Sequence, residues 1–166
     1  MDFETFEASL EPGGPHHALR RMAGRWRGTA RTWFMPGELA DESPIEGEVR
    51  AILGGRFMCH EYSGTIEGAP VTGMAIHGYD VDAGEYITSW VDSFHNGTTI
   101  MLSRSPRDAE RDGFSVLGGY GGGDERWGWR TEVAFPSAGR LTITHYNITP
   151  AGEEAKAVEI DYERVV

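Results

Sequence analysis

The sequence has a single cysteine and no long hydrophobic run. Cys59 is the one cysteine among 166 residues, so a disulfide within the chain is excluded. No segment approaches the run of about 18 apolar residues that a membrane-spanning helix needs. Neither His-x-x-x-His nor Cys-x-x-Cys spacing occurs, and we therefore expect no metal site.

Positive charge is also scarce. The chain has 15 Lys and Arg against 26 Asp and Glu, which gives a net charge of −11. A field of this sign repels phosphate backbones and anionic lipids, so we expect neither nucleic acid nor a membrane as partner. The first residues, Met-Asp-Phe-Glu-Thr-Phe-Glu, lack the basic and apolar regions of a secretory signal. We therefore expect a cytoplasmic location.

Long helical patterns are missing as well. Only Pro15–Ala23 reads as a helix, because Pro occupies the first position and Gly24 follows the last turn. Residues 1–14 show no periodicity and are predicted to form an N-terminal arm, which leaves residues 15–166 as one domain. A helix this short must dock on a larger element, and one end of a sheet or barrel is the simplest place.

Two-residue alternation, in contrast, runs through the rest of the chain and is typical of half-buried β-strands. Turn residues separate the runs, with 23 glycines and 8 prolines in all. Gly54-Gly55 and Asn96-Gly97 predict tight hairpins, and the glycines of residues 118–123 predict a loop. The strands expected are 25–34, 44–53, three runs within 54–97, 98–105, 113–118, 126–135, 140–149 and 156–165.

About ten strands in up-and-down order are too many for one short helix to cover. Closing the sheet removes its edges. We therefore predict an all-β fold: a single antiparallel up-and-down β-barrel of about ten strands with a short N-terminal helix. In the first two strands Arg25, Arg27 and Arg31 alternate outward, as do Glu46 and Glu48, which predicts cross-strand ion pairs.

Several motifs make the chain similar to known families. Gly24-Arg25-Trp26 after a short helix, with Arg164 near the end, resembles the calycin signature, which implies that Arg164 lies over Trp26 and closes the barrel. The chain also resembles the family catalogued as domain of unknown function 1579, which implies a calycin-like barrel without an assigned activity. The segments that carry this second resemblance are residues 54–57, 61–64, 78–80, 90–92 and 159–164.

The inward rows of the central strands supply the candidate site. Alternation predicts an aromatic-lined interior with a few polar groups, which is how small-molecule sites are built. A one-residue slip of any strand would exchange its two faces. The candidate ligand-binding residues are Glu61, Met74, Trp90, Asp92, Trp129 and His145.

The function expected is therefore the binding of a small, largely apolar molecule inside the barrel. One alternative is an enzyme that uses Glu61 or Asp92 as acid or base. A second, implied by the likeness to nitrobindin-type barrels, is a haem held by one strand histidine, although no cofactor is otherwise expected. A third is a barrel filled by its own side chains that serves self-association, for example as a homodimer.

Overall fold

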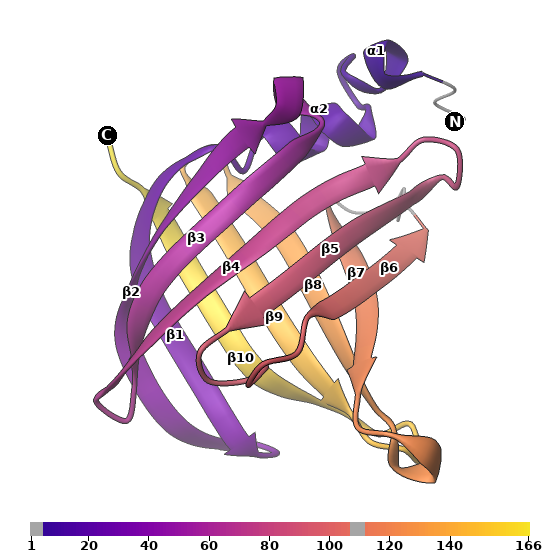
Figure 1. The fold of residues 1–166 in the computed structure, drawn as a ribbon. Coiled ribbons are helices and arrows are strands. Elements are labelled where there is room, and N and C mark those ends of the chain that lie inside the picture. Colours follow the sequence, from indigo (N-terminus) through magenta and orange to yellow (C-terminus); the bar gives the residue numbers. More distant parts are fainter. Residues whose placement is uncertain (1–4, 107–111) are drawn as a thin grey trace.

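The computed structural model describes residues 5–106 and 112–166, which form a closed antiparallel β-barrel (Figure 1). Strands that follow one another in sequence are neighbours in the barrel, and β1 pairs with β10 to close it, which confirms the predicted fold. No described helix is long and apolar enough to cross a membrane. The strands are β1 (Gly24–Met35), β2 (Glu38–Ile52), β3 (Phe57–Ile66), β4 (Ala69–Asp80), β5 (Glu85–Asp92), β6 (Met101–Pro106), β7 (Gly113–Tyr120), β8 (Trp127–Ser137), β9 (Arg140–Ile148) and β10 (Glu154–Arg164).

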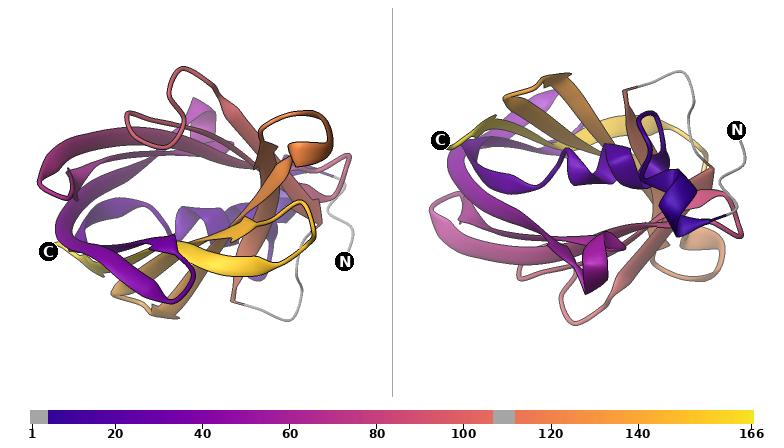
Figure 2. Two further views of the ribbon diagram at one scale, coloured as in Figure 1. Left: turned by 90° about the horizontal axis from the view of Figure 1, so that it is seen from below. Right: turned by 90° about the horizontal axis from the view of Figure 1, so that it is seen from above.

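Two short helices, α1 (Phe6–Ser9) and α2 (Pro15–Arg20), lie at one end of the barrel (Figures 1 and 2). Helix α2 begins at Pro15 as expected but ends three residues before Ala23. Leu19 of α2 and Met22 after it are fully buried in the core, so this helix docks through its apolar face. The opposite end of the barrel carries the loops β5–β6 and β7–β8 (Figure 1).

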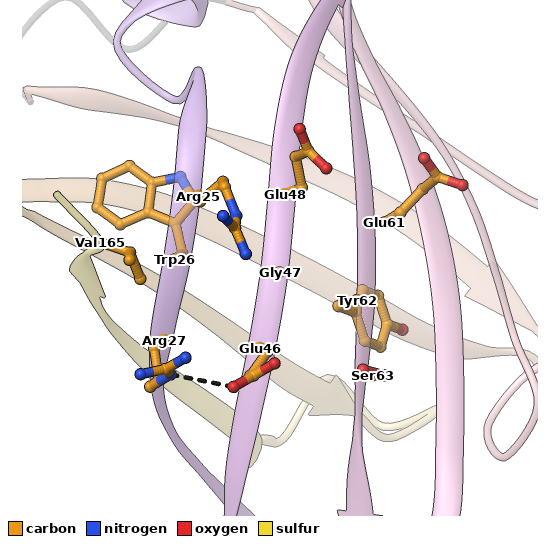
Figure 3. A pocket seen from close by; sticks show the side chains of 10 residues that line it. All are labelled: Arg25, Trp26, Arg27, Glu46, Gly47, Glu48, Glu61, Tyr62, Ser63 and Val165. Carbon is orange, nitrogen blue, oxygen red and sulfur yellow. Dashed lines mark hydrogen bonds and ion pairs between the residues drawn. The ribbon is translucent and has the colours of Figure 1, made fainter.

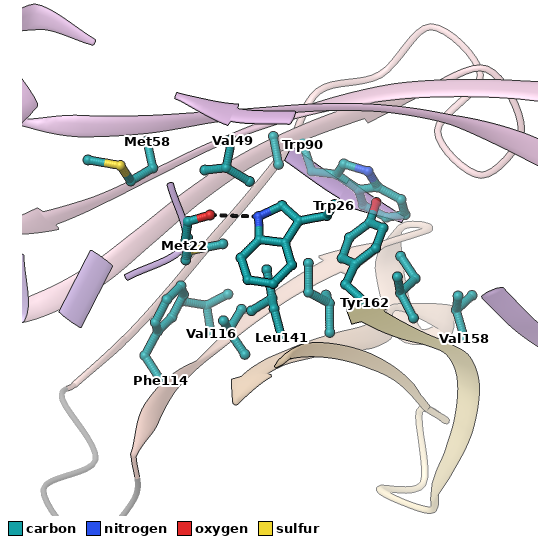
Figure 4. Close-up of a cluster of buried hydrophobic side chains, with 14 of the residues drawn as sticks. Met22, Trp26, Val49, Met58, Trp90, Phe114, Val116, Leu141, Val158 and Tyr162 are labelled. Atoms are coloured by element: carbon teal, nitrogen blue, oxygen red, sulfur yellow. Dashed lines mark hydrogen bonds between the residues drawn. The ribbon is translucent and has the colours of Figure 1, made fainter. Parts of the chain in front are cut away.

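The closing seam is built around Trp26 and Arg164, which face each other across β1 and β10. The Arg164 guanidinium lies 4.3 Å from the centre of the Trp26 ring, and its Nη1 donates to the carbonyl of Ala23 at 2.6 Å. Trp26 Nε1 donates to the carbonyl of Met22 at 2.8 Å (Figure 4). A single aromatic–cation pair therefore ties both terminal strands to the segment that follows α2.

The barrel wall follows the predicted ionic pattern on β1 and β2 in part: Arg27 pairs with the predicted Glu46, whereas Arg31 pairs with Glu42, which is not among the predicted glutamates. Arg27 Nε lies 3.0 Å from a Glu46 carboxylate oxygen, and Arg31 Nε lies 2.6 Å from one of Glu42. These pairs lie at the surface, where water and salt screen them, so each contributes little to stability. They mark the outer face and thereby fix which residues of β1 point inward.

On β3 and β4, however, the predicted inward faces were wrong. Met58 and His60 of β3 are buried, whereas the Glu61 side chain is 52% exposed. Glu61 lies opposite Met74 in the ladder, and Met74 is 37% exposed on the same outer face. Both faces of β3 begin with apolar residues, so alternation could not show which face points inward. Because β4 pairs with β3, the wrong choice on β3 gave the wrong face on β4 as well.

The two predicted tight hairpins are longer turns in the structure. Gly54-Gly55 lies in the 3-10 turn η1 (Leu53–Gly55), where both glycines have positive φ. Asn96-Gly97 lies in a loop of residues 93–100 between β5 and β6 rather than at the two central positions of a hairpin. The cause is the Asp92 carboxylate, which binds the backbone of this loop as described below.

The ladder between β6 and β7 is the thinnest of the barrel. Within the described residues the two strands share one register pair, Arg104 with Leu117, whereas β5 and β6 share six. Gly118 allows a close approach here, because a Cβ on it would lie 2.3 Å from Ser103 Oγ. The two strands are thus packed together more than they are hydrogen-bonded.

Candidate functional site

A pocket of about 540 Å³ opens at the end of the barrel away from the helices. It lies between the β5–β6 loop and the end of β7 with the following loop, which contains the 3-10 turn η2 (Gly123–Glu125). Across the same end of the barrel, Phe34 of β1 stacks on Phe94 with ring centres 6.2 Å apart. The pocket is lined by Trp90, His95, Asn96, Thr99, Met101, Gly119, Tyr120, Gly121, Arg126, Trp129 and Asn147.

Stacked rings form the inner side of this pocket. Trp90 of β5 and Trp129 of β8 stack with ring centres 5.4 Å apart at an interplanar angle of 16°. His145 of β9 stacks on Trp90 at 5.3 Å and, through Nδ1, accepts a hydrogen bond from Trp129 Nε1 at 3.2 Å. Rings fixed by stacking and by hydrogen bonds offer a flat, rigid apolar surface.

Asp92 organises the loop beside the pocket. Its carboxylate accepts hydrogen bonds from the backbone N–H groups of Phe94, His95 and Asn96, and His95 Nδ1 donates to Oδ2 at 2.5 Å. Burial by itself would raise the pKa of Asp92, but His95 and these backbone donors outweigh it and hold the pKa below its ordinary value. The ionised carboxylate therefore fixes both the loop and the His95 ring.

Tyr62 connects Asp92 to the tryptophan pair. Trp90 Nε1 donates to Tyr62 Oη at 2.8 Å, and Tyr62 Oη donates to Asp92 Oδ2 at 3.4 Å. Burial raises the pKa of Tyr62, so this hydroxyl stays protonated and remains a donor. The ring occupies the space beside Gly73, where a Cβ would lie 2.2 Å from Tyr62 Cζ.

The barrel interior beyond the pocket is almost filled. Two voids, of about 40 and about 20 Å³, lie around Tyr62, Trp90 and His145. Such volumes hold one or a few waters, whereas ligand pockets measure about 300–1,000 Å³. These two voids are therefore too small for an organic ligand, and the pocket at the open end is the larger space.

Three histidines border the smaller void and are deeply buried. His60 Nε2 lies 3.2 Å from Tyr162 Oη, His77 Nδ1 lies 2.9 Å from Thr88 Oγ1, and Thr131 Oγ1 lies 2.9 Å from His145 Nδ1. Burial lowers the pKa of His60 to about 4 and those of His77 and His145 to about 3. All three are therefore neutral near pH 7.

The histidines do not fit the haem alternative. His77 Nε2 is buried without a hydrogen-bond partner and would be the free ligand atom, but the void beside it measures only about 20 Å³. This is more than tenfold below the size of a cofactor pocket, about 300 Å³ or more. Among the described residues no group of three or more His, Cys, Asp or Glu side chains is arranged to hold a metal ion.

The structure brings together four of the six predicted ligand-binding residues. Trp90, Trp129 and His145 form the ring stack, and Asp92 is linked to it through Tyr62. Glu61 and Met74 are the exceptions, because both lie on the outer wall.

Glu61 instead borders a groove of about 320 Å³ on the outside of the barrel (Figure 3). Its carboxylate lies 3.5 Å from an Arg50 nitrogen. The groove is lined mainly by charged side chains, among them the Arg27–Glu46 ion pair. Glu61 and Asp92 therefore do not face a common site, and they cannot act as a paired acid and base.

Sequence reasoning missed the rim of the pocket, namely His95, Tyr120 and Arg126. His95 and Arg126 lie in two loops that are distant in sequence, and Tyr120 is the last residue of β7. Strand alternation says nothing about loops and little about strand ends. One signal was present: Asp92 precedes three residues whose backbone N–H groups an Asp side chain can cap, a common turn motif.

Comparisons with known proteins give a family and a fold. The S-type phycobiliprotein lyase CPES from Guillardia theta matches with a TM-score of 0.58 at 11% identity, covering 90% of this chain and 92% of the lyase chain. A protein of unknown function from the DUF3598 family of Nostoc punctiforme aligns over 92% of this chain at 8% identity, with a TM-score of 0.28. No curated protein matches.

The first of these structures shares the barrel fold with this chain, and at such low identity the likeness extends to the fold alone. A family model matches residues 11–164, which include α2 and all ten strands. This chain therefore belongs to the family described as "Protein of unknown function (DUF1579)".

Proposed function

We propose that this protein binds a small, flat, largely apolar molecule in the pocket at the open end of the barrel. The observation that carries the proposal is the pocket itself, whose volume of about 540 Å³ falls within the usual range for small-molecule sites. Trp90, Trp129 and Met101 supply its apolar surface. The fold is shared with a phycobiliprotein lyase, so at least one enzyme has a similar barrel.

Filling the pocket from its rim is expected to abolish binding without disturbing the core. Thr99 is exposed and lines the pocket, whereas Thr98 beside it is exposed but does not. We expect the neutral fluorescent probe N-phenyl-1-naphthylamine to bind the wild type saturably. In Thr99→Trp its affinity should fall at least about tenfold, or about 1.4 kcal/mol, because the indole takes the place of the probe.

Thr98→Trp is the matched control, since it adds the same indole one residue away from the pocket. Its affinity for the probe should stay within about twofold of the wild type. Equal affinity in both variants, or no saturable binding to the wild type, would overturn the proposed function.

An enzyme is the second candidate, favoured by the His95–Asp92 pair. A carboxylate that fixes Nδ1–H of a histidine leaves Nε2 as a proton acceptor, and the His95 ring borders the pocket. The candidate acid or base expected from sequence is Glu61 or Asp92; in this arrangement Asp92 would act through His95, and Glu61 would have no part.

The variant His95→Gln separates the two candidates. If the protein is an enzyme, we expect native mass spectrometry to find different small molecules copurifying with the wild type and with the variant, because the variant no longer converts the bound molecule. A pure binding protein predicts the same molecule in both. Thr98→Trp serves as the control that leaves the pocket lining unchanged.

Self-association remains a further prediction, supported by an apolar row on the outer wall. Met74 of β4 lies opposite Val91 of β5. Leu102 of β6, opposite Ser89, and Leu117 of β7, opposite Arg104, lie on the same outer face, and all four apolar residues are exposed. Such a row is of the kind that homodimers cover. The calycin likeness and a cytoplasmic location likewise remain predictions from sequence.

A further inference from the structure

We propose, resting on the proposed function, that the ligand of the pocket is a flat aromatic or conjugated acid whose anionic group binds Arg126. The proposal adds a substrate class to the pocket. Three observations support it: the position of the Arg126 guanidinium, the lack of a described carboxylate partner for it, and the residues that line the pocket around it.

The guanidinium of Arg126 lies against the backbone of β7. Its Nε and Nη2 are 3.0 and 3.1 Å from the position that a Cβ on Gly119 would occupy, and both residues line the pocket. The glycine thus leaves room for the guanidinium at the pocket rim. Planar guanidinium groups bind carboxylates and sulfonates through paired N–H donors, so the side chain is suited to an oxyanion.

Arg126 also lacks the carboxylate partner that most other described arginines have. Arg31 pairs with Glu42 at 2.6 Å, Arg130 with Glu154 at 2.8 Å and Arg140 with Asp161 at 2.7 Å. No ion pair or hydrogen bond joins Arg126 to any other described residue. Among the described residues, Arg126 therefore presents to the pocket a cation that no carboxylate pairs with.

Among the residues that the structure describes, none that lines the pocket carries a carboxylate. The nearest acids in sequence, Asp124 and Glu125 of η2, are exposed and do not line it. Asn147 uses its Oδ1 to accept from Tyr120 Oη at 2.7 Å, which leaves the amide N–H donors of Asn147 for a ligand. Arg126 and Asn147 therefore both present N–H donors at the pocket, which suits an acceptor group on the ligand.

A matched pair of probes tests the proposal. N-phenyl-1-naphthylamine is neutral, and 8-anilinonaphthalene-1-sulfonate has the same ring frame with one sulfonate added. In Arg126→Gln we expect the affinity for the sulfonate probe to fall about tenfold, as for loss of one charged hydrogen-bonding partner, while the neutral probe changes less than about twofold. Added salt should weaken the sulfonate probe in the wild type but hardly in the variant.

Two further variants complete the design. Arg126→Lys keeps the charge and should restore part of the affinity for the sulfonate probe. Arg25→Gln removes a cation on the outer wall and should change neither probe. The proposal fails if Arg126→Gln leaves the sulfonate probe unaffected or weakens both probes equally.

Different results would contradict the proposed pocket and the proposed acidic ligand. If Thr99→Trp does not block the neutral probe, the pocket is not the site and the proposed function falls. If the neutral probe is blocked but Arg126→Gln spares the sulfonate probe, the pocket stands and only the acidic ligand class is wrong.

Discussion

Lowering the pH from about 7 to about 4.5 is expected to remove most of the free energy of unfolding, because buried histidines, three of them with strongly lowered pKa values, take up protons when the chain unfolds. Their pKa values in the fold are about 4 for His60 and about 3 for His77 and His145, against 6.5 in an exposed chain. Between these limits the unfolded state binds more protons, so stability falls as the pH falls. Each histidine contributes about 1.4 kcal/mol per pH unit.

Three such groups together approach the whole stability of a domain, which is about 5–15 kcal/mol. Asp92 acts in a lower window. Its pKa lies below the ordinary value of 3.8, so its contribution is complete above that value and is lost as the pH falls further. The loss of stability between about pH 6.5 and 4.5 therefore reports the histidines.

Urea denaturation at a series of pH values measures this dependence. In His77→Asn, whose amide replaces the contact to Thr88 Oγ1, the slope below pH 6.5 should fall by about 1.4 kcal/mol per pH unit. His17→Gln is the control, because His17 is exposed on α2. A wild type equally stable across this range, or an unchanged slope in His77→Asn, would contradict the interpretation of the buried histidines.

The second large effect is expected at the seam. Trp26→Ala should reduce the free energy of unfolding by about 4 kcal/mol, since truncating a buried Trp costs about 3–5 kcal/mol. Trp26 is only 2% exposed, and its loss also removes the hydrogen bond to Met22 and the contact with Arg164. The measurement is urea denaturation near pH 7.

Trp33→Ala is the matched control for this variant. Trp33 lies in the same strand, towards the other end of the barrel, and is only half-buried. Its replacement should cost about 1 kcal/mol, within the usual range for a partly exposed site. Equal losses in the two variants would show that the seam has no special weight in closing the barrel.

The fold could be predicted because its signals are local and repeated. Alternation in each strand gave all ten strands, and the positions of Trp26 and Arg164 pointed to closure between β1 and β10. Alternation was insufficient where both faces of a strand are apolar. Cys59 on the outer row of β3 is 4% exposed and His60 on the inner row 2%, so burial itself hardly distinguishes them.

The site was only half predictable, for a different reason. Trp90, Trp129 and His145 lie on strands, where alternation applies, and the fold brings their rings together. Their part in ligand binding stays a prediction. His95 and Arg126 lie beyond strand ends, on loops that meet only once the barrel has closed. The spacing of residues along the chain does not show that these two loops lie side by side in the fold.

The one register pair that joins β6 and β7 within the described residues has a consequence for the size of the molecule that the pocket can take. Hydrogen bonds between all neighbouring strands keep the circumference of a barrel constant. Between β6 and β7 this bonding is nearly interrupted, beside Met101 and Gly119 of the pocket. Parting these two strands breaks few bonds, whereas parting any other pair would break a full row. We therefore expect the wall to widen between β6 and β7 for a bulkier ligand while the other strand pairs keep their register.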